Sequence, residues 1–155
     1  MDRDQFYVKV AHALSGCQLV EQQLKLYISE ALELAKKCIA DRMVFKMSGE
    51  DYEDSSLERL IEAFKKLTEN SQLVADLRRF KDERNFLSHK GITHCLDYEG
   101  DLFYSIAEEY EVRLAAIQVE AERLRRALHE EGSRISIELD FGFLPEKSGS
   151  GAGAA

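Results

Sequence analysis

The chain has 155 residues, a length that fits a single domain whose hydrophobic core needs no disulfide or metal. Hydrophobic residues make up 45% and charged residues 32%, and there is one proline, a composition typical of helical bundles that excludes a disordered chain. The net charge of −8 disfavours DNA binding, and it allows contact with RNA only where basic residues are locally concentrated.

The first predicted helix spans residues 5–40. Its apolar residues recur at alternating steps of four and three, the spacing of a helix that packs in a bundle. The stripe consists of Ala13, Cys17, Val20, Leu24, Tyr27, Ala31, Leu34 and Cys38. Residues 41–55 form a connection that is long for a bundle.

Two shorter helices follow, predicted over residues 56–68 and 70–90, and together they roughly match the first in length. A fourth helix is expected over residues 100–131, with Gly132 ending it. These elements predict an all-α, up-and-down bundle of four main helices over residues 1–132.

Beyond residue 132 the pattern changes from a helical to an alternating one. Ile135, Ile137 and Leu139 alternate with polar residues, which is typical of a strand. We therefore expect residues 133–147 to form an extended tail, lying across the bundle or pairing with another chain. Residues 148–155 are Gly-, Ser- and Ala-rich and read as a flexible linker of the kind added in protein engineering.

The sequence predicts a cytoplasmic protein that does not enter a membrane. Its N-terminus lacks the pattern of a signal peptide, and no apolar run approaches the ~20 residues that span a bilayer. Three widely spaced cysteines form no disulfide framework. The spacing of His89, His94, Cys95 and Asp97 matches no strong zinc pattern, so we predict no metal and no cofactor.

The third helix carries the strongest anomaly. Arg84 continues the apolar stripe of Leu73, Leu77, Phe80 and Leu87. A buried guanidinium without a partner is costly, so Arg84 requires a carboxylate such as Glu21, a phosphate ligand or a wet cleft. Residues 78–90 also hold five basic residues against two acidic ones, which makes them the expected RNA-binding surface. That surface comprises Arg78, Arg79, Lys81 and Lys90.

Asn85 and His89 lie four residues apart and share a face of the same helix. Near the C-terminus of a helix the dipole favours imidazolium, and histidine is a group that exchanges protons near neutral pH. Arg84 lies five residues before His89, about 140° around a straight helix. The two converge only through the reach of Arg84, an unwound last turn, or two subunits. The structural alternatives are a helix-capping role for His89 and a surface role for Asn85.

The segment from Glu83 to His89 reads Glu-Arg-Asn-Phe-Leu-Ser-His and resembles the Arg-Asn-x3-His signature of the HEPN superfamily. The resemblance covers residues 5–131 and includes the order of the helices. It implies a metal-independent endoribonuclease of a toxin–antitoxin, antiphage or RNA-processing system, active as a homodimer. In that scheme His89 is the general base or acid, Arg84 stabilises charge on the scissile phosphate, and Asn85 orients the substrate or His89.

One position departs from part of that superfamily. HEPN toxins that are neutralised by nucleotidyl transfer carry a tyrosine two residues after the histidine, where this chain has Gly91. Neutralisation of this chain by a cognate antitoxin through nucleotidyl transfer is therefore not expected. The alternative functions are a non-catalytic HEPN-like module that binds a nucleotide or a partner protein, and a plain helical oligomerisation domain.

Overall fold

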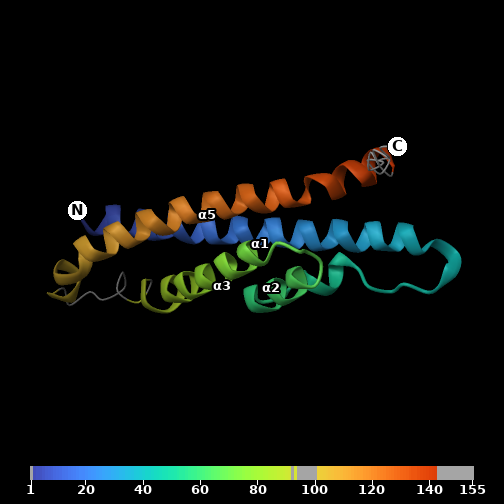
Figure 1. The fold of residues 1–155 in the computed structure, drawn as a ribbon. Helices are drawn as coiled ribbons and strands as arrows, with labels where there is room; N and C mark the ends of the chain where they lie inside the picture. The colour runs from blue at the N-terminus through green and yellow to red at the C-terminus, as the bar shows by residue number, and fades with distance from the viewer. Residues whose placement is uncertain (1, 92, 94–100, 143–155) are drawn as a thin grey trace, which may run out of the picture.

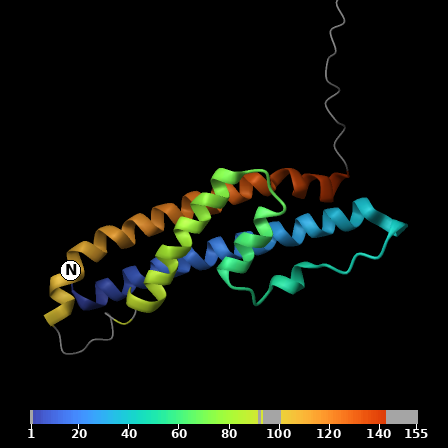
Figure 2. The ribbon, with the colours of Figure 1, turned by 60° about the horizontal axis from the view of Figure 1, so that its bottom comes forward.

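The computed structural model describes residues 2–91, 93 and 101–142. Every regular element among these residues is helical, which confirms the predicted all-α bundle of four main helices. The long helices α1 (Arg3–Ile39) and α5 (Asp101–Phe141) lie side by side. The shorter helices α2 (Leu57–Lys65) and α3 (Ser71–Phe86) cover one face of this pair, as Figures 1 and 2 show from two directions.

Helices α1 and α5 run in the same direction. Lys9 pairs with Glu111 near the start of both helices, and Ser136 donates a hydrogen bond of 2.7 Å to Glu30 near their ends. Helix α3 runs in the opposite direction, so that its last turns lie beside the first turns of α5 (Figure 1). The end of α3, where the sequence places its candidate site, is therefore close to the beginning of α5.

The long connection between α1 and α2 has a structural task, because it runs back along α1. It contains two short 3-10 turns, η1 (Ala40–Arg42) and η2 (Gly49–Tyr52). Lys25 of α1 donates to the carbonyl oxygen of Glu53, and a Cβ atom on Gly49 would clash with the side chain of Ser29. The connection is thus held against α1, and it is long because it must return along that helix before α2 begins.

The predicted apolar stripes form the core. Along α1 the predicted stripe is buried from Ala13 to Tyr27, and apolar residues of α5 between Leu114 and Leu128 are buried in the same core. Cys17 is buried, and burial together with the nearby Glu21 carboxylate raises the pKa of its thiol to about 12. Cys38, which the stripe also predicted to be inward, is exposed. It lies in the last turn of α1, beyond the part that α2 and α3 cover (Figure 1).

The expected change to an extended tail at residue 133 is corrected for the described residues, because α5 continues as a helix to Phe141. The alternating pattern also fits a helix, since Leu128, Ile135 and Leu139 are seven and four residues apart and so share one face of α5. Ile135 packs against the core, and Lys37 donates a hydrogen bond of 3.2 Å to the carbonyl oxygen of Leu139. Residues 143–147 of the expected tail, and residues 148–155, lie outside the described residues.

Two glycines allow α1 and α5 to approach closely. A Cβ atom on Gly132 would lie 3.2 Å from the Tyr27 ring, and one on Gly16 would lie 3.1 Å from the Cβ atom of Ala121. The expectation that Gly132 ends this helix is therefore wrong, because α5 continues past it. Gly132 makes room for Tyr27, whose hydroxyl donates a 3.2 Å hydrogen bond to the carbonyl oxygen of Leu67.

The contact at Gly16 generates a prediction about stability. The Cβ atom of Ala121 is fixed to its backbone and cannot move aside, so Gly16→Val must push α1 and α5 apart. We expect a loss of about 2 kcal/mol in the free energy of unfolding, a typical cost of overpacking, measured by urea denaturation. The neighbouring Ser15→Val, at an exposed position, should change it by less than about 0.5 kcal/mol. Equal effects of the two substitutions would contradict the close packing.

Candidate functional site

The last turn of α3 departs from α-helical geometry. Asn70 caps the start of α3 by accepting a hydrogen bond from the backbone of Leu73, and the helix runs to Phe86. The next residues form a π turn, η3 (Leu87–Gly91). Leu87 and Gly91 are buried and anchor this turn, whereas His89 is exposed. Single π turns of this kind occur often at functional sites.

His89 lines an open cleft of about 520 Å³ between the end of α3 and the beginning of α5. The predicted site residues Asn85, His89 and Lys90 all contribute to its α3 side. The remaining lining residues are Asp82, Phe86, Glu109, Tyr110 and Arg113. The structure therefore brings together a proton-exchanging imidazole, an amide and a cation on one surface.

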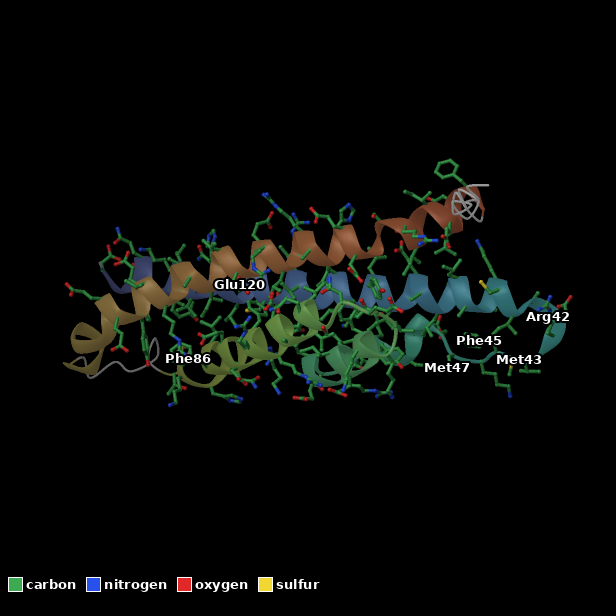
Figure 3. The ribbon with its side chains drawn as sticks, viewed as in Figure 1. Arg42, Met43, Phe45, Met47, Phe86 and Glu120 are labelled. Carbon is green, nitrogen blue, oxygen red and sulfur yellow. The ribbon has the colours of Figure 1, made fainter. Side chains whose placement is uncertain are left out.

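On the α5 side of the cleft, Arg113 is held by an ion pair and by contact with an aromatic ring. The Arg113 guanidinium donates to both carboxylate oxygens of Glu83, at 2.8 and 3.2 Å, and lies 3.4 Å from the centre of the Phe86 ring. Tyr110 meets the same ring edge-on, with centroids 5.2 Å apart. Figure 3 shows Phe86 beside the end of α3. A bidentate ion pair and ring contacts therefore hold the Arg113 guanidinium in this position.

Arg84 does not line the cleft of His89. Its Nε atom donates a 3.0 Å hydrogen bond to Glu21 of α1, and its Nη1 atom donates one of 3.3 Å to the hydroxyl of Ser88. The Arg84 side chain is 36% exposed and that of Glu21 is 18% exposed. Glu21 is thus the carboxylate that the stripe position required. The π turn does not bring Arg84 and His89 to one surface of a single chain.

Three of the four predicted RNA-binding residues are engaged in ion pairs. Arg78 donates to Glu62 of α2 at 2.6 Å, Lys81 pairs with Glu58 of α2, and Arg79 pairs with Asp76 on α3 itself. The fourth, Lys90, is exposed and forms no ion pair among the described residues. The local excess of positive charge in the sequence is therefore largely neutralised in the fold.

Asp76 is the buried polar residue that fixes α3 on α5, with 6% of its surface exposed. Gln72 donates to one of its carboxylate oxygens and Arg123 of α5 to the other, both at 2.8 Å. Burial alone would raise the pKa of Asp76, but the hydrogen bonds from Arg123, Gln72 and Arg79 outweigh it and hold this pKa below its usual value. Asp76 is therefore ionised in the folded protein.

Sequence reasoning missed the contribution of α5 to the cleft. Tyr110 is half-buried against the core, and Arg113 belongs to none of the motifs that the sequence offers. These two residues lie three positions apart and so share a helix face. Their position near the start of α5 is the feature that could have identified them. It brings them beside the end of α3 only if the two helices are antiparallel, which the sequence does not state.

No three metal-binding side chains come together among the described residues, and His94, Cys95 and Asp97 lie outside them. Within the same part of the chain, no helix combines the length and apolar character needed to cross a membrane. Comparison with family models, with curated proteins and with solved structures finds no match for this chain. The resemblance to the HEPN superfamily thus rests on the motif and the order of the helices alone.

The ionised state of Asp76 generates a pH-dependent prediction. Because its pKa is lowered on folding, the stability that it contributes is present above pH 3.8 and is lost as the pH falls through the lower folded value. Asp76→Asn should cost about 2 kcal/mol at pH 7, measured by urea denaturation, and the difference should shrink below pH 4. Asp82→Asn, at an exposed position of α3, is the matched control and should have little effect. A constant difference down to pH 2 would show that ionisation is not the cause.

Proposed function

We propose that this chain is a metal-independent endoribonuclease of the HEPN type, acting in a toxin–antitoxin, antiphage or RNA-processing setting. The observation that carries the proposal is the position of His89. Its imidazole is exposed on a π turn, in a cleft that also holds the Asn85 amide and the Lys90 ammonium. These are the groups that a phosphodiester needs for cleavage by its own neighbouring hydroxyl.

The proposed reaction is attack of a ribose 2′-oxygen on the adjacent phosphorus. A new bond forms from O2′ to phosphorus and the bond from phosphorus to O5′ breaks, which leaves a 2′,3′-cyclic phosphate and a 5′-hydroxyl. His89 accepts the proton of the 2′-hydroxyl or donates one to the leaving O5′, and water carries the other transfer. Asn85 donates a hydrogen bond that orients the ribose or phosphate.

Within one chain, Lys90 is the cation best placed to neutralise the scissile phosphate. It lines the same cleft as His89, and no carboxylate among the described residues pairs with it. Arg113 also lines the cleft, but Glu83 already satisfies two of its nitrogens. A cation beside developing phosphate charge lowers the barrier most when no carboxylate competes for it.

The family scheme also gives Arg84 a role, and a homodimer is the arrangement that allows it. In the single chain Arg84 lies on the α1 side of α3, away from the cleft. We propose that a second copy presents its Arg84 to the phosphate held beside His89. The half-exposed guanidinium fits this role, since Glu21 and Ser88 occupy only part of its donor set.

The second candidate is a non-catalytic HEPN-like module that binds a nucleotide or a partner protein. The specific observation in its favour is that carboxylates pair with Arg78, Arg79 and Lys81, so that little of the expected RNA-binding surface is available. A chain of net charge −8, whose cleft offers Lys90 as a lysine that forms no ion pair with the described residues, would then bind a small phosphate-bearing ligand rather than a long RNA.

The His89 assignment is tested with purified protein and a 5′-labelled RNA in the presence of EDTA. We expect cleavage to a 2′,3′-cyclic phosphate, and His89→Ala should slow it by about 10²–10⁴-fold, the usual contribution of a general acid or base. His129→Ala is the matched control, because His129 is an exposed histidine on α5 away from the cleft, and it should keep full activity. Cleavage that EDTA abolishes would contradict the mechanism, and intact RNA would favour the binding module.

The dimer is tested by mixing two inactive variants, His89→Ala and Arg84→Ala. If each site combines His89 of one copy with Arg84 of the other, a mixed dimer keeps one intact site. Statistical exchange should then restore about a quarter of the wild-type rate in a two-fold dimer. If both residues of a site belong to one chain, every site in the mixture is damaged and no activity returns, which would refute the shared site while leaving the role of His89 intact.

A further inference from the structure

A second cavity lies beside the cleft of His89, in the same groove between α3 and α5. It has a volume of about 300 Å³ and is lined by Arg79, Phe80, Glu83, Arg113, Ala116, Ile117 and Glu120. Arg113 lines both cavities, so the two meet at its side chain. Because α3 and α5 are antiparallel, the second cavity lies about one and a half turns, roughly 8 Å, from the cleft along both helices. Figure 3 shows the same order, with Glu120 nearer the middle of the molecule than Phe86.

The floor of this second cavity is apolar. Phe80 and Ile117 are each 2% exposed and belong to the hydrophobic core, and the small side chain of Ala116 leaves space beside them. The volume is at the lower end of the roughly 300–1,000 Å³ that small-ligand sites occupy. The cavity therefore suits one flat ring system, with an apolar face against the floor and polar edges toward the rim.

One network of ion pairs holds the polar groups at the rim. Arg79 of α3 and Glu120 of α5 line the cavity from different helices. Arg79 pairs with Asp76, and Arg123 donates to Asp76 at 2.8 Å and to the two oxygens of Glu120 at 2.8 and 2.6 Å. Asp76 at the centre of this network is buried, so the network orients both rim groups before a ligand arrives. Orientation in advance lowers the entropic cost of binding.

Both rim groups keep capacity for further hydrogen bonds. Among the described residues, one nitrogen of Arg79 donates, to Asp76, and the other N–H groups of its guanidinium have no partner. The Arg79 side chain is 74% exposed and reaches the rim from solvent. Each carboxylate oxygen of Glu120 accepts from Arg123 and has a further lone pair. The rim thus offers a fork of donors from α3 and a pair of acceptors from α5.

Guanine is the nucleobase whose edges match this rim. Its O6 and N7 atoms accept a bidentate contact from a guanidinium, and its N1–H and N2–H₂ groups donate to a carboxylate. Adenine has an amino group where guanine has O6, so a donor would face Arg79, and the single rings of cytosine and uracil would leave part of the volume empty.

We propose that this cavity, the base pocket, binds the guanine base of the nucleotide that adjoins the phosphate in the cleft of His89. The shared residue Arg113 makes the two sites continuous, so that one nucleotide places its base in the base pocket and its phosphate beside Lys90. The identification of this base as part of an RNA rests on the proposed ribonuclease function.

The base pocket is tested by calorimetric titration of the full chain with the 3′- and 5′-monophosphates of guanosine, adenosine, cytidine and uridine. We expect a guanosine monophosphate to bind at least about tenfold more tightly than the same isomer of the other three, the discrimination of a good bidentate base contact. Lys90→Ala should weaken binding of all the nucleotides by the same factor, because it acts on the phosphate. Equal binding of the four bases, a preference for another base, or no binding at millimolar nucleotide would overturn the proposal.

Protein variants locate the guanine preference. Glu120→Ala and Arg79→Ala should each reduce it by about tenfold while binding of uridine monophosphate stays unchanged, an outcome that general loss of structure does not produce. Ala116→Phe should remove the preference by filling the base pocket. The matched controls are Ala115→Phe and Glu130→Ala, at exposed positions of α5 that do not line the pocket, and both should bind as the wild type does. A preference that survives both Glu120→Ala and Ala116→Phe would refute the base pocket.

Cleavage in the presence of EDTA separates this proposal from the ribonuclease proposal. On a 5′-labelled RNA with a single guanosine, the wild type should cut next to that guanosine, and Ala116→Phe should cut without preference. Cleavage of the wild type at all positions alike would refute the base pocket and leave the ribonuclease standing. A guanosine monophosphate preference without any cleavage would refute the ribonuclease and support the pocket as a site for a free guanine nucleotide.

Discussion

The rotation of α3 about its own axis decides which of its polar residues are available to a ligand. Its buried residues, above all Leu73, Leu77 and Phe80, belong to the core where α3 packs against α2 and α5, and Asp76 fixes the same helix to Arg123 from its flank. Once these contacts are made, Arg84 must turn toward α1 and Asn85 and His89 toward the start of α5. The candidate site is thus a consequence of core packing rather than of the motif alone.

The same packing also pairs most of the basic side chains of α3 with carboxylates. In the sequence, residues 78–90 are a basic segment in an acidic chain. In the fold, α2 lies alongside α3 and offers Glu58 and Glu62 to the cations of that segment. Each pair is partly exposed, so it adds little to stability, yet it lowers the positive field that a polyanion would meet. At the far end of the molecule, Arg42 and Lys46 form no ion pair among the described residues, although Asp41, Glu50 and Asp51 lie in the adjoining turns.

Much of the fold could be predicted because one-dimensional periodicity determines it. The helices, their inward faces and the need of Arg84 for an acidic partner all follow from spacing, and Glu21 is the partner found. The parallel course of α1 and α5 depends on the path of the connection along α1, which periodicity does not encode. The alternation of apolar residues after residue 132 fits both a strand and one face of a helix. The helix forms because α1 extends alongside as far as Lys37 and offers a surface for it to pack on.

The π turn at Leu87–Gly91 shows why the site itself was only half predictable. Spacing along an α-helix correctly put Asn85 and His89 on one face, but it could not say whether Arg84 joined them. The answer depends on Glu21, which lies far away in the sequence and competes for the guanidinium. If Arg84 takes part in chemistry, it must do so while Glu21 still holds its Nε atom. A phosphate would then bind to the remaining donors of an arginine that is already oriented, and orienting a cation in advance removes part of the entropic cost of binding the ligand.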